Sequence, residues 1–142
     1  MVRTLLGITV GALWLATLCV AVSAQNAGNG GWTKIPPNAA EEKNPFPTND
    51  ALLAAGKKVF TNKCVRCHGP LGKGDGPDAE SEHKDDMDLT RADRAAKNPD
   101  GVVFYKVWNG RSSPRMPNFE DQLSKEQAWA VVAYVQTLRK KS

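Results

Sequence analysis

Three residues in the stretch KCVRCHG have the types and spacing to hold a redox cofactor. Cys64 and Cys67 are three positions apart, and His68 follows the second cysteine directly. C-x-x-C-H is the sequence at which haem c is attached to proteins. Two thiols at this spacing can add to the two vinyl groups of a haem edge, and the next residue then offers an imidazole nitrogen to the iron. We therefore expect one covalent haem c, with His68 as an iron ligand.

Two other chemistries of paired cysteines fit this chain less well. A thioredoxin-like C-x-x-C is found beside a βαβ pattern, and no such pattern is visible in the sequence. A structural zinc ion takes four ligands. Apart from the motif itself, only His83 and carboxylates remain to complete such a set, without a second cysteine pair.

The stretch GRSSPRMPNF, residues 110–119, offers a second iron ligand in Met116. A thioether is a soft ligand that suits haem iron and raises its reduction potential. Filling gaps in a core is the ordinary role of methionine, but Met116 lies in a polar loop bounded by two prolines, which favours the ligand role. His83, Met87 and an open iron site are the alternatives. Both of these residues lie in an acidic stretch that we expect to be exposed.

The first 24 residues have the pattern of an export signal. Arg3 gives a positive start, residues 5–22 are apolar, and Val22 and Ala24 supply the modest side chains that a signal peptidase reads. We expect residues 1–24 to be a cleaved signal peptide and the protein to be periplasmic. The alternative is an uncleaved membrane anchor, because an apolar run of this length is close to the minimum for spanning a bilayer.

The remainder of the chain divides into an arm and one domain. Residues 25–47 are rich in Gly, Asn and Pro, and we expect an extended, partly disordered arm, with Trp32 and Phe46 as candidates for contact with the domain. The domain then covers residues 48–142. A net charge of +4 in 142 residues is too small to suggest a nucleic-acid partner.

The domain has the apolar periodicity of helices in three places. A helix over residues 50–62 can be capped by Thr48 or Asn49, and its apolar stripe includes Gly56, which suggests that another helix crosses close by. A second helix is expected over residues 100–109. The last begins at Ser124, with the spacing of a capping box. No stretch alternates as a strand does, so the fold class is all-α.

From about residue 50 to 140 the chain resembles a bacterial monohaem class I cytochrome c. The matching pieces are AAGKKVFTNKCVRCHG, GKGDGP, VWNGRSSPRMPNF and LSKEQAWAVVAYVQTL. The resemblance implies short helices and long loops around a covalent haem. It also implies thioether bonds from Cys64 and Cys67, His68 as proximal ligand and Met116 as distal ligand. In the family a backbone carbonyl after the motif supports the proximal histidine, and the region of Pro77 is the candidate here.

These features predict a periplasmic single-electron carrier rather than an enzyme. Redox proteins are its expected partners, and no small-molecule substrate is expected. Docking is expected to be guided by charge around the motif, where Lys57, Lys63 and Lys73 lie. The alternatives are a cytochrome c subunit of a dehydrogenase or oxidase complex, and a gas-binding or peroxidase-type haem protein with an open iron site.

Overall fold

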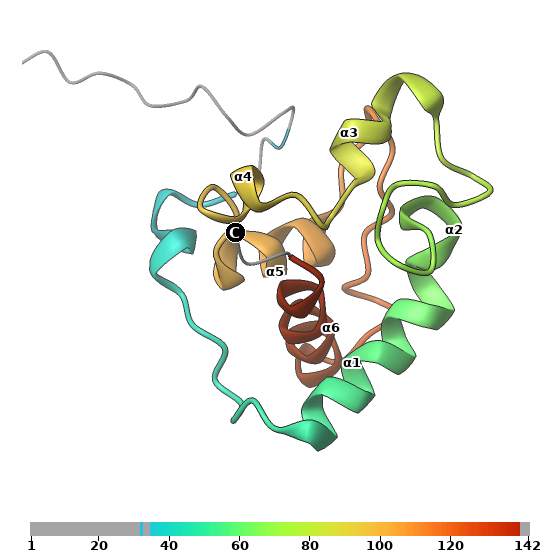
Figure 1. Ribbon diagram of the computed structural model, residues 1–142. Helices are drawn as coiled ribbons and strands as arrows, with labels where there is room; N and C mark the ends of the chain where they lie inside the picture. The colour runs from blue at the N-terminus through green and yellow to red at the C-terminus, as the bar shows by residue number, and fades with distance from the viewer. Residues whose placement is uncertain (1–31, 33–34, 140–142) are drawn as a thin grey trace, which may run out of the picture.

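Two long helices cross to form the centre of the molecule, as a computed structural model of the chain shows (Figure 1). The structure describes residue 32 and residues 35–139, so the predicted signal peptide, most of the first half of the arm and the last three residues lie outside the described part. The elements in chain order are η1 (Pro37–Glu41), α1 (Asp50–Lys63), α2 (Val65–His68), η2 (Ser81–His83), α3 (Lys84–Met87), α4 (Ala92–Ala95), α5 (Asp100–Asn109) and α6 (Lys125–Leu138).

The ends of α1 and α6 carry the caps that their sequences predict. The side chain of Asn49 accepts a hydrogen bond from the backbone N–H of Leu52 at 2.9 Å. At α6, the Ser124 hydroxyl accepts from the backbone N–H of Gln127, and the Gln127 side chain accepts from the backbone N–H of Ser124. Both arrangements satisfy amides that the first turn of a helix leaves without an intrahelical partner.

The crossing of α1 over α6 depends on the absence of a side chain at Gly56. A Cβ atom built there would overlap the backbone carbonyl of Ala130 and touch the Cβ of Tyr134. Four residues further along α1, the ring of Phe60 packs against that of Tyr134, with the centroids 5.4 Å apart. The close approach that the sequence suggested at Gly56 is therefore confirmed.

The main core lies where α5 packs against α6. Its buried residues are Phe60, Val103, Phe104, Val107, Phe119, Leu123, Ala128, Trp129, Val131, Val132 and Val135. Phe104 stacks on Trp129 with a centroid distance of 4.3 Å. The described part of the arm is fastened to these helices, because Ala39 of η1 is buried and Asn44 donates to the carbonyl of Trp129 at 3.3 Å.

The chain between α2 and α5 contains short helices that the sequence analysis did not predict. In Figure 1 it runs over the top of the molecule, from α2 through α3 to α4. Within residues 35–139 no strand is assigned, and pairing is limited to two isolated bridges, Lys73 with Asp88 and Arg111 with Met116. The all-α fold class is confirmed. Among the described residues, no helix combines the length and apolar character that a membrane crossing requires.

Candidate functional site

The four residues singled out in the sequence line one cavity. Cys64 is the residue just before α2, Cys67 lies within α2 and His68 is its last residue. Met116 comes from the loop after α5. The cavity has a volume of about 510 Å³, within the range of cofactor sites. Its apolar walls come from α1, α5 and α6, through Phe60, Val103, Val107, Val131 and Val135.

The two cysteines are held as neutral thiols beside the cavity. They are not joined by a disulfide, and both are half-buried. Burial, reinforced by the neighbouring Cys67, raises the pKa of Cys64 to about 12, and burial also raises the pKa of Cys67. Zinc ligation and nucleophilic redox chemistry both use the thiolate, so this environment disfavours them.

The imidazole of His68 is oriented by a backbone carbonyl. Its Nδ1 lies 2.7 Å from the carbonyl oxygen of Met87. A carbonyl only accepts, so Nδ1 must carry the hydrogen and Nε2 keeps its lone pair. Removal of the ring from water lowers the pKa of His68 and favours this neutral form. The carbonyl support expected near Pro77 is therefore supplied instead by Met87, because α3 brings that residue behind the ring.

The loop that carries Met116 is closed by its own backbone. Arg111 and Met116 exchange two hydrogen bonds, each N–H donating to the other residue's carbonyl at 2.9 Å. Gly110 begins this turn with φ of +61°, and a Cβ there would crowd the carbonyl of Met116. The loop thus brings the thioether-bearing residue to the cavity without a helix or strand.

Of the two alternative iron ligands, Met87 lines the cavity and His83 does not. Met87 is buried and lines the cavity, so the expectation that it is exposed was wrong. The backbone carbonyl of Met87 accepts the hydrogen bond from His68 Nδ1. His83 lies outside the residues that line the cavity and pairs with Glu80 at 3.6 Å.

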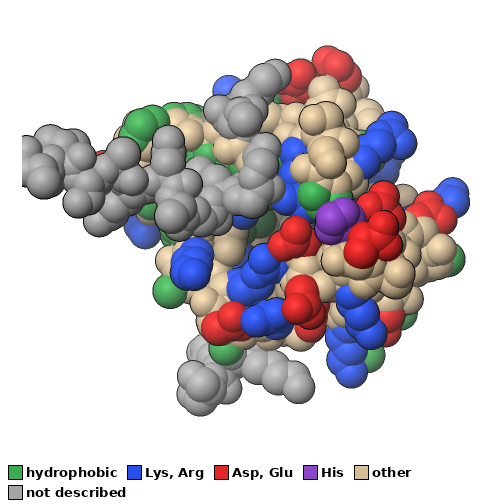
Figure 2. All heavy atoms as spheres, turned by 90° about the horizontal axis from the view of Figure 1, so that it is seen from above, with side chains coloured by type: hydrophobic (Ala, Val, Ile, Leu, Met, Phe, Trp, Pro, Cys, Tyr) green, Lys and Arg blue, Asp and Glu red, His purple; other side chains and the backbone are tan. Residues whose placement is uncertain are grey.

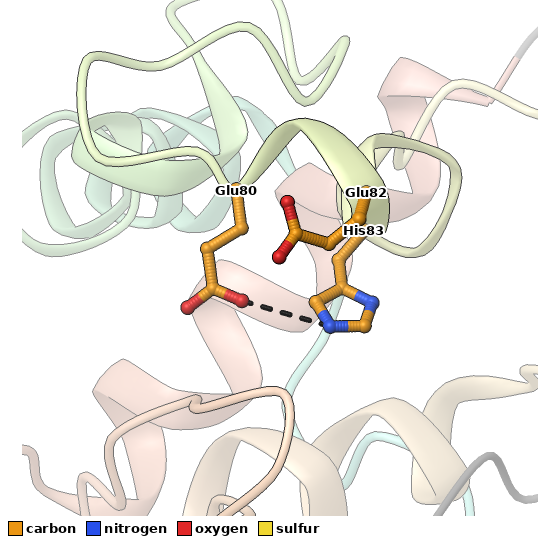
Figure 3. A group of neighbouring side chains, drawn as sticks. All are labelled: Glu80, Glu82 and His83. Carbon is orange, nitrogen blue, oxygen red and sulfur yellow. Dashed lines mark ion pairs between the residues drawn. The ribbon is translucent and has the colours of Figure 1, made fainter.

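Figure 3 shows the side chains of Glu80 and His83 pointing toward one another, with Glu82 beside them. The ligand atoms of these three residues lie within 4.8 Å of one another. The two glutamates are exposed and His83 is half-buried, so the group lies at the surface.

Positively charged side chains gather around Lys106 in α5. Burial, together with the nearby cations Arg111, Arg94 and Arg139, lowers the pKa of Lys106 to about 8. Trp32 of the arm lies over this group, with its ring centroid 4.8 Å from Arg111 Cζ and 5.3 Å from Lys106 Nζ. Cation–π contact between the arm and the cavity was not foreseen from the sequence.

Comparison with known proteins gives a consistent result. The family model for cytochrome c matches residues 53–139. Cytochrome c6 of Parathermosynechococcus lividus is 33% identical over 85 residues, which cover 60% of this chain and 88% of that protein.

Solved structures agree with the fold. A chain of the reducing HAO-like protein complex of Kuenenia stuttgartiensis is 29% identical, with a TM-score of 0.58 over 70% of this chain. Cytochrome cL of the methylotroph Methylophaga aminisulfidivorans is 24% identical, with a TM-score of 0.51 over 65%. The chain spans 50% of the first structure and 56% of the second.

The residues around the cavity fit the cofactor of this family. A haem c needs two thiols and an iron ligand at one edge, apolar walls beside the ring, and counter-charges for its two carboxylates. Cys64, Cys67 and His68 supply the first set, and α1, α5 and α6 supply the walls. The cluster has four cations, Lys106, Arg94, Arg111 and Arg139, and the charged neighbours of Lys106 include one carboxylate, Asp86. This cluster therefore suits an anionic group, which the haem carboxylates would provide.

Proposed function

Since this chain belongs to the cytochrome c family, we propose that it is a periplasmic single-electron carrier with one haem c. In this proposal Cys64 and Cys67 form the thioether bonds, and His68 and Met116 are the axial ligands. A bound haem would supply the one-electron couple of its iron. The observation that carries the proposal is that the two thiols, the oriented imidazole and the thioether-bearing loop all line one cavity.

The chain's own residues have three tasks in this proposal. The Met87 carbonyl holds His68 in the tautomer that leaves Nε2 available. The apolar side chains of α1, α5 and α6 exclude water from the walls of the cavity. The loop closed by Arg111 and Met116 keeps the second ligand in reach. None of these tasks breaks a bond in a substrate, and this supports a carrier rather than an enzyme.

A carrier of this kind meets its partners through weak, charge-guided contacts around the motif. Lys57, Lys63 and Lys73 are exposed, and Lys63 lines the cavity together with Cys64 and Cys67. Neutralising all three to glutamine is expected to slow reduction by a protein partner about tenfold at low salt, and to have little effect at high salt. Stopped-flow rates across ionic strength measure this. Rates that do not depend on these lysines at any salt concentration would remove the docking idea.

A second candidate is a cytochrome c subunit of a larger redox complex. The similarity to a chain of the reducing HAO-like protein complex favours it. The described part of the arm lies against α5 and α6, and Trp32 lies over Arg111, so any tether in the arm to a larger subunit would begin before residue 32. Co-purification with a larger protein from the native source would support this candidate, and a free monomer would support the shuttle.

Axial ligation is tested by optical spectra of the purified haem protein. A weak absorption band at the red end of the oxidised spectrum, lost in Met116→Ala, is the expected signature of the thioether. The reduced wild type should resist carbon monoxide, whereas Met116→Ala should bind it. Immediate carbon monoxide binding by the wild type would instead indicate an open iron site, as in a gas-binding or peroxidase-type protein.

A further inference from the structure

Asp86 connects the segment that supports His68 with the loop that carries Met116. It directly precedes Met87, whose carbonyl accepts the hydrogen bond from His68. Its carboxylate accepts a hydrogen bond from Arg94 at 2.6 Å through Oδ1. The other oxygen, Oδ2, lies 3.5 Å from Nη2 of Arg111. The Asp86 carboxylate is therefore in contact with Arg111, which belongs to the loop that carries Met116 (residues 110–119, the Met116 loop).

Arg111 carries this contact into the loop itself. Its Nε donates to the carbonyl of Pro114 at 2.8 Å, and its backbone exchanges hydrogen bonds with Met116. The side chain is only 9% exposed, and the ring of Trp32 covers the guanidinium. A charged contact sheltered from water is stronger than one on the surface.

Among the described contacts, apolar packing of the loop comes from Met116, which lies against the main core, and from Phe119 at the end of the loop. Ser112, Ser113, Arg115 and Pro117 are exposed, and Met116 is half-exposed. Few buried apolar contacts make a segment prone to local opening. The position of the loop should therefore depend strongly on the polar contacts of Arg111.

We propose that the Asp86–Arg111 ion pair is a brace that keeps the Met116 loop closed over the cavity. Asp86 and Arg111 are thus positioning residues for the Met116 thioether, and the brace ties this loop to the backbone that supports His68. This inference rests on the axial ligation proposed above. It also gives the acidic segment 78–99 a role inside the molecule, in addition to its surface.

Other acidic residues of the same segment provide a contrast. Asp85 and Asp93 pair with Arg91, and these carboxylates are 90% and 63% exposed. Asp78 pairs with Arg66 at 2.7 Å, and both side chains are well exposed. These pairs lie within the segment or beside α2, and such surface pairs contribute little to stability. Asp85 therefore offers a matched control, because it is next to Asp86 and has the same chemistry.

The brace is tested by titrating the oxidised haem protein with imidazole, which competes with Met116 for the iron. If the brace keeps the loop closed, Asp86→Asn and Arg111→Gln should each bind imidazole about tenfold more tightly than the wild type, about 1.4 kcal/mol. The double variant should bind no more tightly than Arg111→Gln, because that variant already lacks the ion pair, together with the Nε donation to Pro114. Asp85→Asn should match the wild type.

The opposite charges of the two residues separate a brace from simple electrostatics. Asp86→Asn makes the site more positive and Arg111→Gln makes it less positive, so a purely electrostatic effect would move the two affinities in opposite directions. Opposite shifts, independent effects in the double variant, or affinities equal to that of the wild type would each overturn the proposal. Arg111→Lys keeps the charge but loses the fork geometry, and it should also bind imidazole more tightly. It provides the test if Asp86→Asn does not fold.

The oxidised spectrum of the wild type distinguishes a failure of the Met116 ligation from a failure of the brace. If the oxidised wild type lacks the band assigned to the thioether, the proposed Met116 ligation fails. If the band is present and imidazole affinity is the same in all variants, the ligation stands and only the brace fails.

Discussion

The helical framework and the charged wall of the cavity are held together by different forces. The framework consists of α1, α5 and α6, and it is stabilised by buried apolar side chains and close helix contact at Gly56. The charged wall consists of residues 78–99 with Lys106, Arg111 and Arg139. It is held largely by ion pairs and by hydrogen bonds to backbone carbonyls, such as those from Arg139 to the carbonyls of Ala95 and Asn98.

The surface view makes the second region visible. Figure 2 shows a face on which acidic and basic side chains are interspersed, with neither sign forming a continuous patch. Within the charged wall, Arg91 pairs with Asp85 and Asp93, and Arg94 pairs with Asp86. Apolar packing therefore holds the helices in place. The contacts that orient His68 and the loop of Met116 are polar, so single substitutions can weaken them without disrupting the core.

The largest effect is expected in the framework, at Gly56. A Cβ there meets the Ala130 carbonyl, which belongs to the helix backbone and has little freedom to move. Gly56→Ala should lower the free energy of unfolding by about 3 kcal/mol, measured by chemical denaturation. The control is Ala55→Gly on the exposed side of the same helix, which should cost about 1 kcal/mol. If Gly56→Ala costs less than this control, the crossing is not as tight as described.

A smaller effect in the framework is expected at the start of α6. Ser124→Ala removes the hydroxyl that accepts from the backbone N–H of Gln127. The loss should be about 1 kcal/mol of unfolding free energy, as for other helix caps. Ser124→Asp should recover most of it, since a carboxylate can accept the same hydrogen bond. A lack of recovery would mean that the capping box is not the source of the stability.

In the charged wall, Lys106 should make the reduction potential depend on pH. Its pKa is lowered to about 8, first by burial and then by neighbouring cations. Protonated Lys106 disfavours the more positive, oxidised iron, so the potential should be higher while Lys106 is protonated and should fall as the proton is lost. Haem carboxylates beside this lysine would place that step above about pH 8. Lys106→Gln should lower the potential near neutral pH and remove this step, as measured by spectroelectrochemistry. A step that persists in the variant would have to be assigned to another group.

The smallest effect is expected at the surface of the charged wall. Asp78 and Arg66 pair through hydrogen bonds that lower the pKa of Asp78, but both side chains are well exposed. Asp78→Asn should leave the thermal midpoint, the visible spectrum and the imidazole affinity unchanged. A clear change in any of these would show that this exposed pair supports α2.

The sequence predicted the framework better than the wall, for a physical reason. Helix periodicity, the caps at Asn49 and Ser124 and the small residue Gly56 are local signals, and the structure confirms each of them. Within the site, the C-x-x-C-H spacing and the proline-bounded loop were enough to select four residues that line one cavity. Their roles as thioether and iron ligands stay predictions.

The parts that were missed depend on contacts between distant residues. The support for His68 is a backbone carbonyl, and a carbonyl has no side-chain signature that distinguishes Met87 from the region of Pro77. Met87 sits among acidic residues, so composition suggested exposure, although α3 turns it inward. Trp32 was a candidate for contact with the domain, but its partner Arg111, almost eighty positions away, could not be predicted, because the contact leaves no periodic pattern in the sequence.

The central claim is that Cys64 and Cys67 hold one haem covalently within this cavity. The most direct test is the intact mass of the exported protein under denaturing conditions, with Cys64→Ala/Cys67→Ala as the control. The account predicts the polypeptide mass plus one haem for the wild type, and polypeptide alone for the control. A colourless wild type with the mass of its polypeptide alone would contradict it.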